Sequence, residues 1–156
     1  MNETLFTEMV ELHTDAIYRF CVLYVKNHHD AQDCTQDTFI KLYKQKIDNR
    51  DHIKNWLYVV ARRECLQLLR FSWRKTIIDD DLIAQFSMHE NKDDFSLILS
   101  CPQKYREVLY LYYYEDYSQA EIAQLLNLSI DAVKKRMVRG RDYLKETLEG
   151  VETHEG

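Results

Sequence analysis

The sequence predicts an all-helical protein made of two small domains joined by an acidic, flexible linker. Only one proline and three glycines occur among its 156 residues, and all three glycines follow residue 139. Folds that need glycine in a phosphate-binding loop or a tight hairpin are therefore excluded. Apolar residues recur at helical spacing through long stretches of good helix formers, which favours helices throughout.

Three amphipathic segments make up the predicted first domain, residues 1–72. The first covers about 2–26, and the second follows an N-cap at Asp30 and runs to about residue 45. The third covers about 51–71, with its apolar residues along one face. These segments predict a compact bundle of three to four helices.

Residues 73–94 lack helical periodicity and are predicted to be the linker. They include three consecutive aspartates, Asp79, Asp80 and Asp81. We expect this segment to be solvated rather than to contact a partner.

The second domain is predicted to span residues 95–150, followed by a short tail, 151–156. A weak helix, Phe95 to Leu99, precedes Pro102. Proline is favoured at the first position of a helix because it has no N–H to leave unsatisfied, so a longer helix is expected from there to Tyr114.

Two further helices, joined by a tight turn, follow in this domain. Ser118 and Glu121 have the spacing of a capping box, and Asn127 is a residue that tolerates the left-handed conformation at a helix end. Ser129 is then placed to cap the next helix, which is rich in lysine and arginine. This arrangement is typical of a helix-turn-helix whose second helix binds DNA.

The phase of this last helix separates a buried stripe from a basic face. At about 100° per residue, Val133, Met137, Gly140 and Leu144 share one side. Lysine and arginine on the other side are suited to guanine edges and phosphates in a major groove. A merely solvated charged face is the alternative. The candidates for contact with duplex DNA are Ser129, Lys134, Lys135, Arg136, Val138, Arg139 and Arg141.

The helix at 51–71 carries a second candidate nucleic-acid surface. Arginines interleaved with an aromatic ring suit single-stranded nucleic acid, because bases stack on rings and cations follow phosphates. Trp56 is expected in the core, and Tyr58 could instead be a rim residue. The side chains predicted to project from the apolar stripe include Asn55, Tyr58, Arg62, Arg63 and Arg70.

Charge is unevenly distributed along the chain, whose formal net charge is −5. Residues 50–75 carry a net +5 and residues 129–149 a net +2, and the acidic segment 76–99, at −5, lies between them. Because salt screens each field within about 8 to 10 Å, local patches rather than the total decide whether a surface attracts phosphate.

Several classes of protein are not indicated. No apolar run approaches the length of a membrane span, so we expect no membrane insertion and a cytoplasmic protein. The four cysteines stand far apart without a CxxC pair and are expected to be reduced, structural residues. We expect neither a metal site, including at His28-His29, nor a cofactor, and the chain offers no catalytic set that would indicate an enzyme.

Three segments in register resemble one family. They are DAQDCTQDTFIKLY at 30–43, NWLYVVARRECLQLLR at 55–70, and the helix-turn-helix region CPQKYREVLYLYYYEDYSQAEIAQLLNLSIDAVKKRMVRGRDYL at 101–144. Together they are similar to the group 4, or extracytoplasmic-function, sigma factors of bacterial RNA polymerase. The resemblance implies that the two domains are a sigma-2-like and a sigma-4-like domain.

The resemblance also implies roles for individual residues. The second helix would dock on the clamp coiled coil of the β′ subunit of core polymerase through Asp33, Gln36, Asp37 and Phe39. The third helix, with the preceding loop and Arg50, would bind the minus-ten element of promoter DNA as a single strand. The last helix would bind the minus-thirty-five element as duplex, and residues 102–114 would hold the β flap. A cognate anti-sigma factor is a further implied partner.

The sequence departs from the family pattern at a few positions. Arg63 and Gln67 replace the usual asparagine and aspartate, so base preference there is not implied by the resemblance. Asp116 and Asn127 stand where glycine is usual, and both tolerate turns.

Two other functions are alternatives to that of a sigma factor. They are a stand-alone helix-turn-helix regulator and an adaptor that binds polymerase without melting DNA.

Overall fold

The computed structural model describes residues 1–71, 81–82 and 92–155, with side chains for 1–71, 81–82 and 95–148. Over these residues the chain forms helices and no strand, as predicted. It divides into two compact units, Met1–Ile83 and Ala84–Gly156. The predicted linker, 73–94, lies outside the described residues except at 81–82 and 92–94, which are helical.

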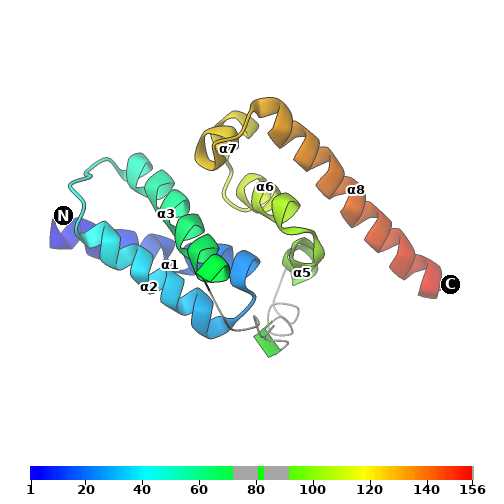
Figure 1. Ribbon diagram of the computed structural model, residues 1–156, viewed down its shortest axis with the longest axis horizontal. Coiled ribbons are helices and arrows are strands. Elements are labelled where there is room, and N and C mark those ends of the chain that lie inside the picture. Colours follow the sequence, from blue (N-terminus) through cyan, green and yellow to red (C-terminus); the bar gives the residue numbers. More distant parts are fainter. Residues whose placement is uncertain (72–80, 83–91, 156) are drawn as a thin grey trace. The chain divides into compact units, whose positions relative to one another are not determined.

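The first unit is built on three helices, each of which packs against the other two (Figure 1). These are α1 (Glu3–Val25), α2 (His28–Tyr43) and α3 (Arg50–Phe71). All three supply fully buried side chains, among them Phe20, Leu42 and Leu57. Because every helix contacts two neighbours, the arc of each helix that must be apolar is wider than for a helix with one neighbour.

Asparagine side chains begin the first two helices. Asn2 caps α1 by accepting from the Thr4 N–H at 2.7 Å, and Asn27 caps α2 by accepting from the Asp30 N–H at 3.0 Å. The prediction that Asp30 is the N-cap is therefore wrong. Asp30 lies inside the first turn of α2, where its carboxylate interacts favourably with the positive end of the helix dipole.

The second unit contains α5 (Lys92–Ser100), α6 (Gln103–Tyr113), α7 (Gln119–Leu126) and α8 (Ile130–Glu155). Helix α6 contacts each of the other three (Figure 1). Helix α5 begins before Phe95, and α8 continues through residues predicted to be a tail. Pro102 takes the N-cap position of α6 with φ −53° and ψ 146°, so the helix begins at Gln103, one residue later than predicted.

Two turns of this unit adopt the left-handed conformation without glycine. Asp116, after α6, has φ 59°, and Asn127, after α7, has φ 55°. Aspartate and asparagine are the non-glycine residues that adopt this region most readily, because their short polar side chains can bond locally to the backbone. The chain therefore makes both turns where the family it resembles usually has glycine.

Candidate nucleic-acid interface

The turn between α7 and α8 is fixed by side-chain caps at both helices. Ser118 accepts from the Glu121 N–H at 3.1 Å, and the Glu121 carboxylate accepts from the Ser118 N–H at 3.0 Å. At the other end, the left-handed Asn127 closes α7, and the Ser129 hydroxyl accepts from the Ala132 N–H at 3.0 Å. The capping box and both predicted caps are confirmed, and they set the angle at which α8 leaves the turn.

Helix α8 packs on α6 and α7 through the stripe predicted from its phase. Val133 and Met137 are fully buried, and Gly140 is buried beside α6. A Cβ atom at residue 140 would lie 2.9 Å from Cδ1 of Leu109 and 3.2 Å from Cβ of Tyr105. The missing side chain therefore permits a close approach of the two helices, which fixes the rotation of α8 about its own axis.

With that rotation, five predicted DNA-binding residues of α8 and its turn are exposed on the side of the helix away from the buried stripe. Ser129, Lys134, Lys135, Val138 and Arg139 all reach solvent, away from the buried stripe. We call this set the recognition face. Three of its members are cationic, and its side chains do not form the core of the unit.

Two further residues predicted to bind DNA, the half-buried Arg136 and the exposed Arg141, contact α6. Nη1 of Arg136 lies 3.8 Å from the buried carboxylate of Glu107. Arg141 donates from Nε to the Tyr113 hydroxyl at 2.9 Å, and its guanidinium lies 5.9 and 6.0 Å from the ring centroids of Tyr112 and Tyr113. Both arginines therefore contribute to holding α8 against α6.

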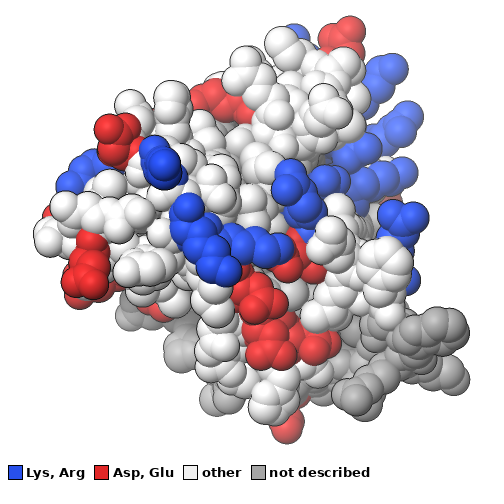
Figure 2. All heavy atoms as spheres, turned by 60° about the vertical axis from the view of Figure 1, so that its left-hand side comes forward, with Lys and Arg blue, Asp and Glu red and all other residues white. Residues whose placement is uncertain are grey.

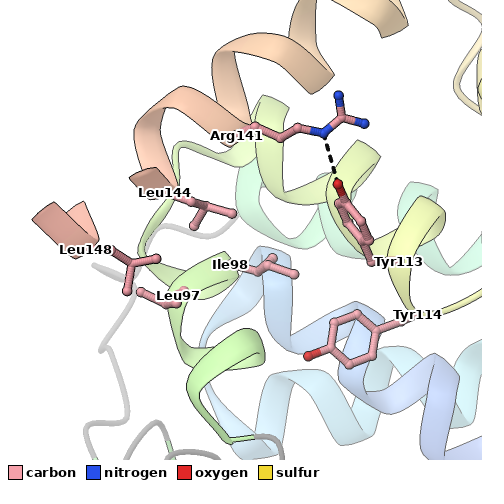
Figure 3. Close-up of a pocket in the computed structure, with 7 residues that line it drawn as sticks. All are labelled: Leu97, Ile98, Tyr113, Tyr114, Arg141, Leu144 and Leu148. Carbon is pink, nitrogen blue, oxygen red and sulfur yellow. Dashed lines mark hydrogen bonds between the residues drawn. The ribbon is translucent and has the colours of Figure 1, made fainter. Parts of the chain in front are cut away.

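Arg141 also borders a cavity of about 660 Å³ formed by α5, α6 and α8 (Figure 3). Its other lining residues are apolar or aromatic, and Figure 3 shows the leucines of α8 on one side of the cavity and the two tyrosines of α6 on the other. The lining residues are Leu97, Ile98, Tyr113, Tyr114, Arg141, Leu144 and Leu148.

The predicted α3 surface is confirmed in part as an exposed surface. Arg63 and Arg70 are exposed, and Asn55 and Arg62 are half-buried at its edge. Arg50, at the start of α3, forms an ion pair with Glu8 at 2.5 Å. These side chains come from one helix, and together they give its solvent side a positive charge.

Tyr58 does not belong to this surface, contrary to the prediction. It is 2% exposed and packs edge-to-face on Phe20 at 5.0 Å between ring centroids. The reason is that α3 packs against both α1 and α2, so its buried arc extends past the narrow apolar stripe inferred from the sequence. Tyr58 is a core residue.

Trp56, which was predicted to lie in the core, is half-buried in the structure. Trp56 and Arg63 are seven positions apart, which places them within about 20° of each other on α3. This phase relation is visible in the sequence. Trp56 was nevertheless predicted to be in the core, because it is apolar and lies next to Leu57, which is fully buried.

On α2, too, a residue predicted to be exposed is buried, and its apolar neighbour is exposed. Asp33, Gln36 and Asp37 are exposed, but Phe39 is 7% exposed and belongs to the core, contrary to the prediction. The apolar residue on the solvent side is Ile40, which is 55% exposed. Its separation from Gln36, four positions, and from Asp33, seven positions, puts it on the same face. We call Asp33, Gln36, Asp37 and Ile40 the α2 face.

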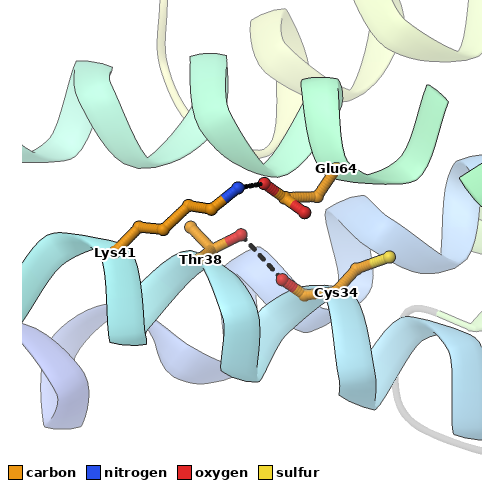
Figure 4. A network of polar contacts seen from close by, with 4 residues as sticks. All are labelled: Cys34, Thr38, Lys41 and Glu64. Carbon is orange, nitrogen blue, oxygen red and sulfur yellow. Dashed lines mark hydrogen bonds and ion pairs between the residues drawn. The ribbon is translucent and has the colours of Figure 1, made fainter. Parts of the chain in front are cut away.

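Helices α2 and α3 are joined by an ion pair at the edge of the core. Lys41 on α2 contacts Glu64 on α3, and one turn earlier the Thr38 hydroxyl donates to the Cys34 carbonyl at 2.7 Å (Figure 4). The Lys41–Glu64 pair adds a polar contact to the packing of α2 against α3, the helices that carry the α2 face and the arginines.

The four cysteines are free and buried. Cys21, Cys34 and Cys65 meet in the core of the first unit, where hydrogen bonding with Cys21 and Cys34, together with burial, raises the pKa of the Cys65 thiol. In the second unit, burial raises the pKa of Cys101 to about 11, and nearby Arg106 opposes the shift. The raised pKa keeps the thiols of Cys65 and Cys101 protonated at neutral pH.

Over the described ranges, no three His, Cys, Asp or Glu side chains are grouped so as to hold a metal ion. Within the same part of the chain, no helix has the length and apolarity required to cross a bilayer. Figure 2 shows groups of lysine and arginine side chains on the face that it draws, as well as acidic side chains.

Comparisons with known proteins agree with this geometry. The family model described as Sigma-70 region 2 matches residues 9–75, and the model of Sigma-70 region 4 matches residues 97–144. The chain is 31% identical over 150 residues to the ECF RNA polymerase sigma factor SigM of Bacillus subtilis, covering 88% of this chain and 91% of the relative. It is 28% identical over 170 residues to SigW of the same species, covering 94% and 90%.

Solved structures show the same fold. CnrH, in complex with the cytosolic domain of CnrY, superposes with a TM-score of 0.71 at 24% identity, over 96% of this chain and 90% of that one. The sigma factor RpoE of Bartonella quintana, in complex with the anti-sigma factor NepR, gives 0.68 at 22% identity, over 92% and 96%. The two-domain match and the relatives together show that the chain belongs to the extracytoplasmic-function family of RNA polymerase sigma factors.

Proposed function

We propose that the recognition face of α8 binds the minus-thirty-five element of the promoter as duplex DNA. The observation that carries this proposal is the outward position of Lys134, Lys135 and Arg139 on the second helix of a capped helix-turn-helix. A helix of this kind fits a major groove, where lysine and arginine contact guanine edges and phosphates. Arg136 and Arg141 serve this surface indirectly, because they hold α8 on α6.

The solvent side of α3 is the proposed site for the minus-ten element as a single strand. Arg62, Arg63 and Arg70 supply positive charge, and Asn55 adds a hydrogen-bonding amide. Half-buried Trp56 takes the stacking role first considered for Tyr58, because it is partly accessible on the side of α3 that also carries Arg63, two turns further along the helix. Arg50, paired with Glu8, lies at the start of the same helix.

The α2 face is the proposed docking site for core polymerase, on the clamp coiled coil of β′. It offers Ile40 as an exposed apolar anchor among the polar and acidic groups of Asp33, Gln36 and Asp37. An apolar anchor within a polar rim is the common anatomy of protein interfaces. This role requires the protein to work in the cytoplasm, as a specificity subunit without catalysis of its own.

The second unit is proposed to bind the β flap along residues 102–114, beside the cavity of α5, α6 and α8. We also propose that a cognate anti-sigma factor regulates the protein, because both structural neighbours are complexes, CnrH with CnrY and RpoE with NepR. For this chain, the functional domains are proposed to be 1–72 and 95–150.

Run-off transcription with core polymerase tests the proposed function. Core enzyme supplied with this chain should initiate at discrete sites, and the double variant Lys135→Ala, Arg139→Ala should lose most of that initiation. Glu11→Ala, which removes an exposed charge of α1 outside the proposed binding surfaces, is the control and should transcribe normally. Tight, selective binding of promoter DNA by the free chain, with no initiation by core enzyme, would instead identify a stand-alone regulator.

A further inference from the structure

Val138 is the apolar member of the otherwise polar recognition face. It is 54% exposed, and the side chains one turn away on the same side include Lys134, Lys135 and Asp142, all exposed and charged. The nearby buried residues of α8, Met137 and Gly140, lie on the side of the helix that packs in the core. Val138 is therefore not a core residue of the unit.

The orientation of Val138 is fixed by the packing of α8. Gly140 sits against Leu109 and Tyr105, and Arg136 is paired with buried Glu107, so the helix has one rotational setting. Residue 138 lies eight positions after the first residue of α8, which is about 12 Å along the helix. A β-branched side chain on a helix also has one strongly preferred rotamer, so the two methyl groups are held in place before any ligand binds.

A valine in a major groove has one chemically specific contact available. Its methyl groups cannot donate or accept a hydrogen bond, and among the four bases only thymine presents a methyl group there, at C5. Lysine and arginine on either side contact guanine or phosphate oxygens. A valine between them therefore distinguishes thymine from cytosine, which has only hydrogen at C5.

We propose that Val138 is a specificity-determining residue that selects a thymine in the minus-thirty-five element by contact with its C5-methyl group. The inference rests on the proposed binding of duplex DNA by α8 and adds the base to be recognised. Burial of one methyl group predicts a loss of about fourfold in affinity when that thymine is replaced by uracil. The replacement changes no hydrogen-bonding group of the base.

Uracil interference with the reconstituted holoenzyme tests the inference. A promoter fragment selected by the holoenzyme from a random pool is prepared with sparse replacement of thymine by uracil, and bound and free fragments are compared. For the wild-type chain, uracil at one position of the minus-thirty-five element should be depleted about fourfold from the bound fraction. For Val138→Ala, the depletion at that position should disappear. Leu12→Ala, which shortens an exposed apolar side chain of α1, should keep the wild-type pattern.

Two further outcomes separate this inference from the function on which it rests. If Lys135→Ala and Val138→Ala both leave binding of the minus-thirty-five element unchanged, then α8 is not the DNA-binding helix, and both proposals are wrong. If Lys135→Ala weakens binding but Val138→Ala shows the wild-type pattern, or no thymine of the element interferes, only the inference is overturned. Because Val138 is exposed, its variant should keep the wild-type melting temperature, which excludes unfolding as a cause.

Discussion

Nη1 of Arg136 on α8 lies 3.8 Å from Oε2 of Glu107 on α6, and the Glu107 side chain is 2% exposed. A buried carboxylate has lost its hydration by water and therefore needs an opposite charge or hydrogen bonds nearby. Arg136 of α8 supplies a positive charge. One side of α8 thus neutralises a charge of the core while the other faces solvent. Arg136 is in this respect a positioning residue.

The first prediction follows from this pair. Arg136→Ala should lower the free energy of unfolding by about 1–3 kcal/mol, the usual effect of removing a partner from a buried polar group. Arg139→Ala, an exposed arginine of the same helix, should change it by no more than about 0.5 kcal/mol. Urea denaturation of the full chain, followed by circular dichroism, measures both. Equal losses would show that the pair does not hold α8.

The second prediction separates the two sides of α8. Lys135→Ala or Arg139→Ala should weaken recognition of the minus-thirty-five element by about 1–3 kcal/mol each if they contact bases, with no loss of folded structure. Val133→Asp places a charge at a fully buried site and should unfold the second unit. Holoenzyme binding to promoter fragments and the helical signal in circular dichroism measure these effects. A similar loss of stability in all three variants would contradict the assigned phase of the helix.

The third prediction concerns the close approach at Gly140. Gly140→Val should destabilise the second unit by about 1–3 kcal/mol, because the added atoms meet Leu109 and Tyr105. Gly140→Ala should cost less, because its single Cβ meets mainly the end of a leucine side chain and alanine gains about 1 kcal/mol in helix propensity. Thermal denaturation ranks the three proteins. A valine variant as stable as wild type would mean that the helices have room to separate.

The fourth prediction distinguishes Ile40 from Phe39. Ile40→Ala, or Asp37→Arg, should reduce co-purification with core polymerase at least tenfold while the chain remains folded, because both residues are exposed on the α2 face. Phe39→Ala should instead lower the free energy of unfolding by about 3–5 kcal/mol, because it opens a cavity in the core. Leu12→Ala is the matched control for Ile40→Ala. Undiminished core binding by the Ile40 and Asp37 variants would place the interface elsewhere.

The fifth prediction is a pH dependence at Cys101. Its pKa is raised to about 11, so the folded chain holds the thiol proton more tightly than the unfolded chain does. The resulting stabilisation is fully present below the ordinary thiol pKa near 9 and is lost as pH rises through 11. The difference in unfolding free energy between wild type and Cys101→Ala should therefore shrink from pH 8 to 11. A constant difference would mean that the thiol titrates alike in both states.

The sequence predicted most of the helices because their caps and periodicity are local. Ser118, Glu121 and Asn127 act on atoms within a few residues of themselves, so the helix-turn-helix could be predicted from residues 118–144 alone. The start of α2 was predicted three residues too late, because asparagine and aspartate are both good N-caps and the sequence offers Asn27 and Asp30. Only the competition between them in the folded chain decides for Asn27.

The surfaces were harder to predict because burial depends on how many neighbours a helix has. Tyr58 and Phe39 each lie on the border of an apolar stripe, and a second packed helix covers them. Trp56 and Ile40 lie on the far side and stay accessible, although their hydrophobicity suggests a place in the core. The phase of the helix places Arg136 and Arg141 beside the buried stripe, but not their contacts, since their partners Glu107 and Tyr113 are 28 or 29 positions away in the chain.

The separation of α8 into a packing side and a recognition face has an evolutionary consequence. Helix α8 packs against the rest of the unit through Val133, Met137 and Gly140. Lys135 and Val138 are exposed and form no part of the core. Substitutions on the recognition face cost little stability, so a duplicated copy of this gene could acquire a new promoter preference without first becoming unstable. For the same reason, the residues of the recognition face could be exchanged by design, to build sigma factors that do not initiate at one another's promoters.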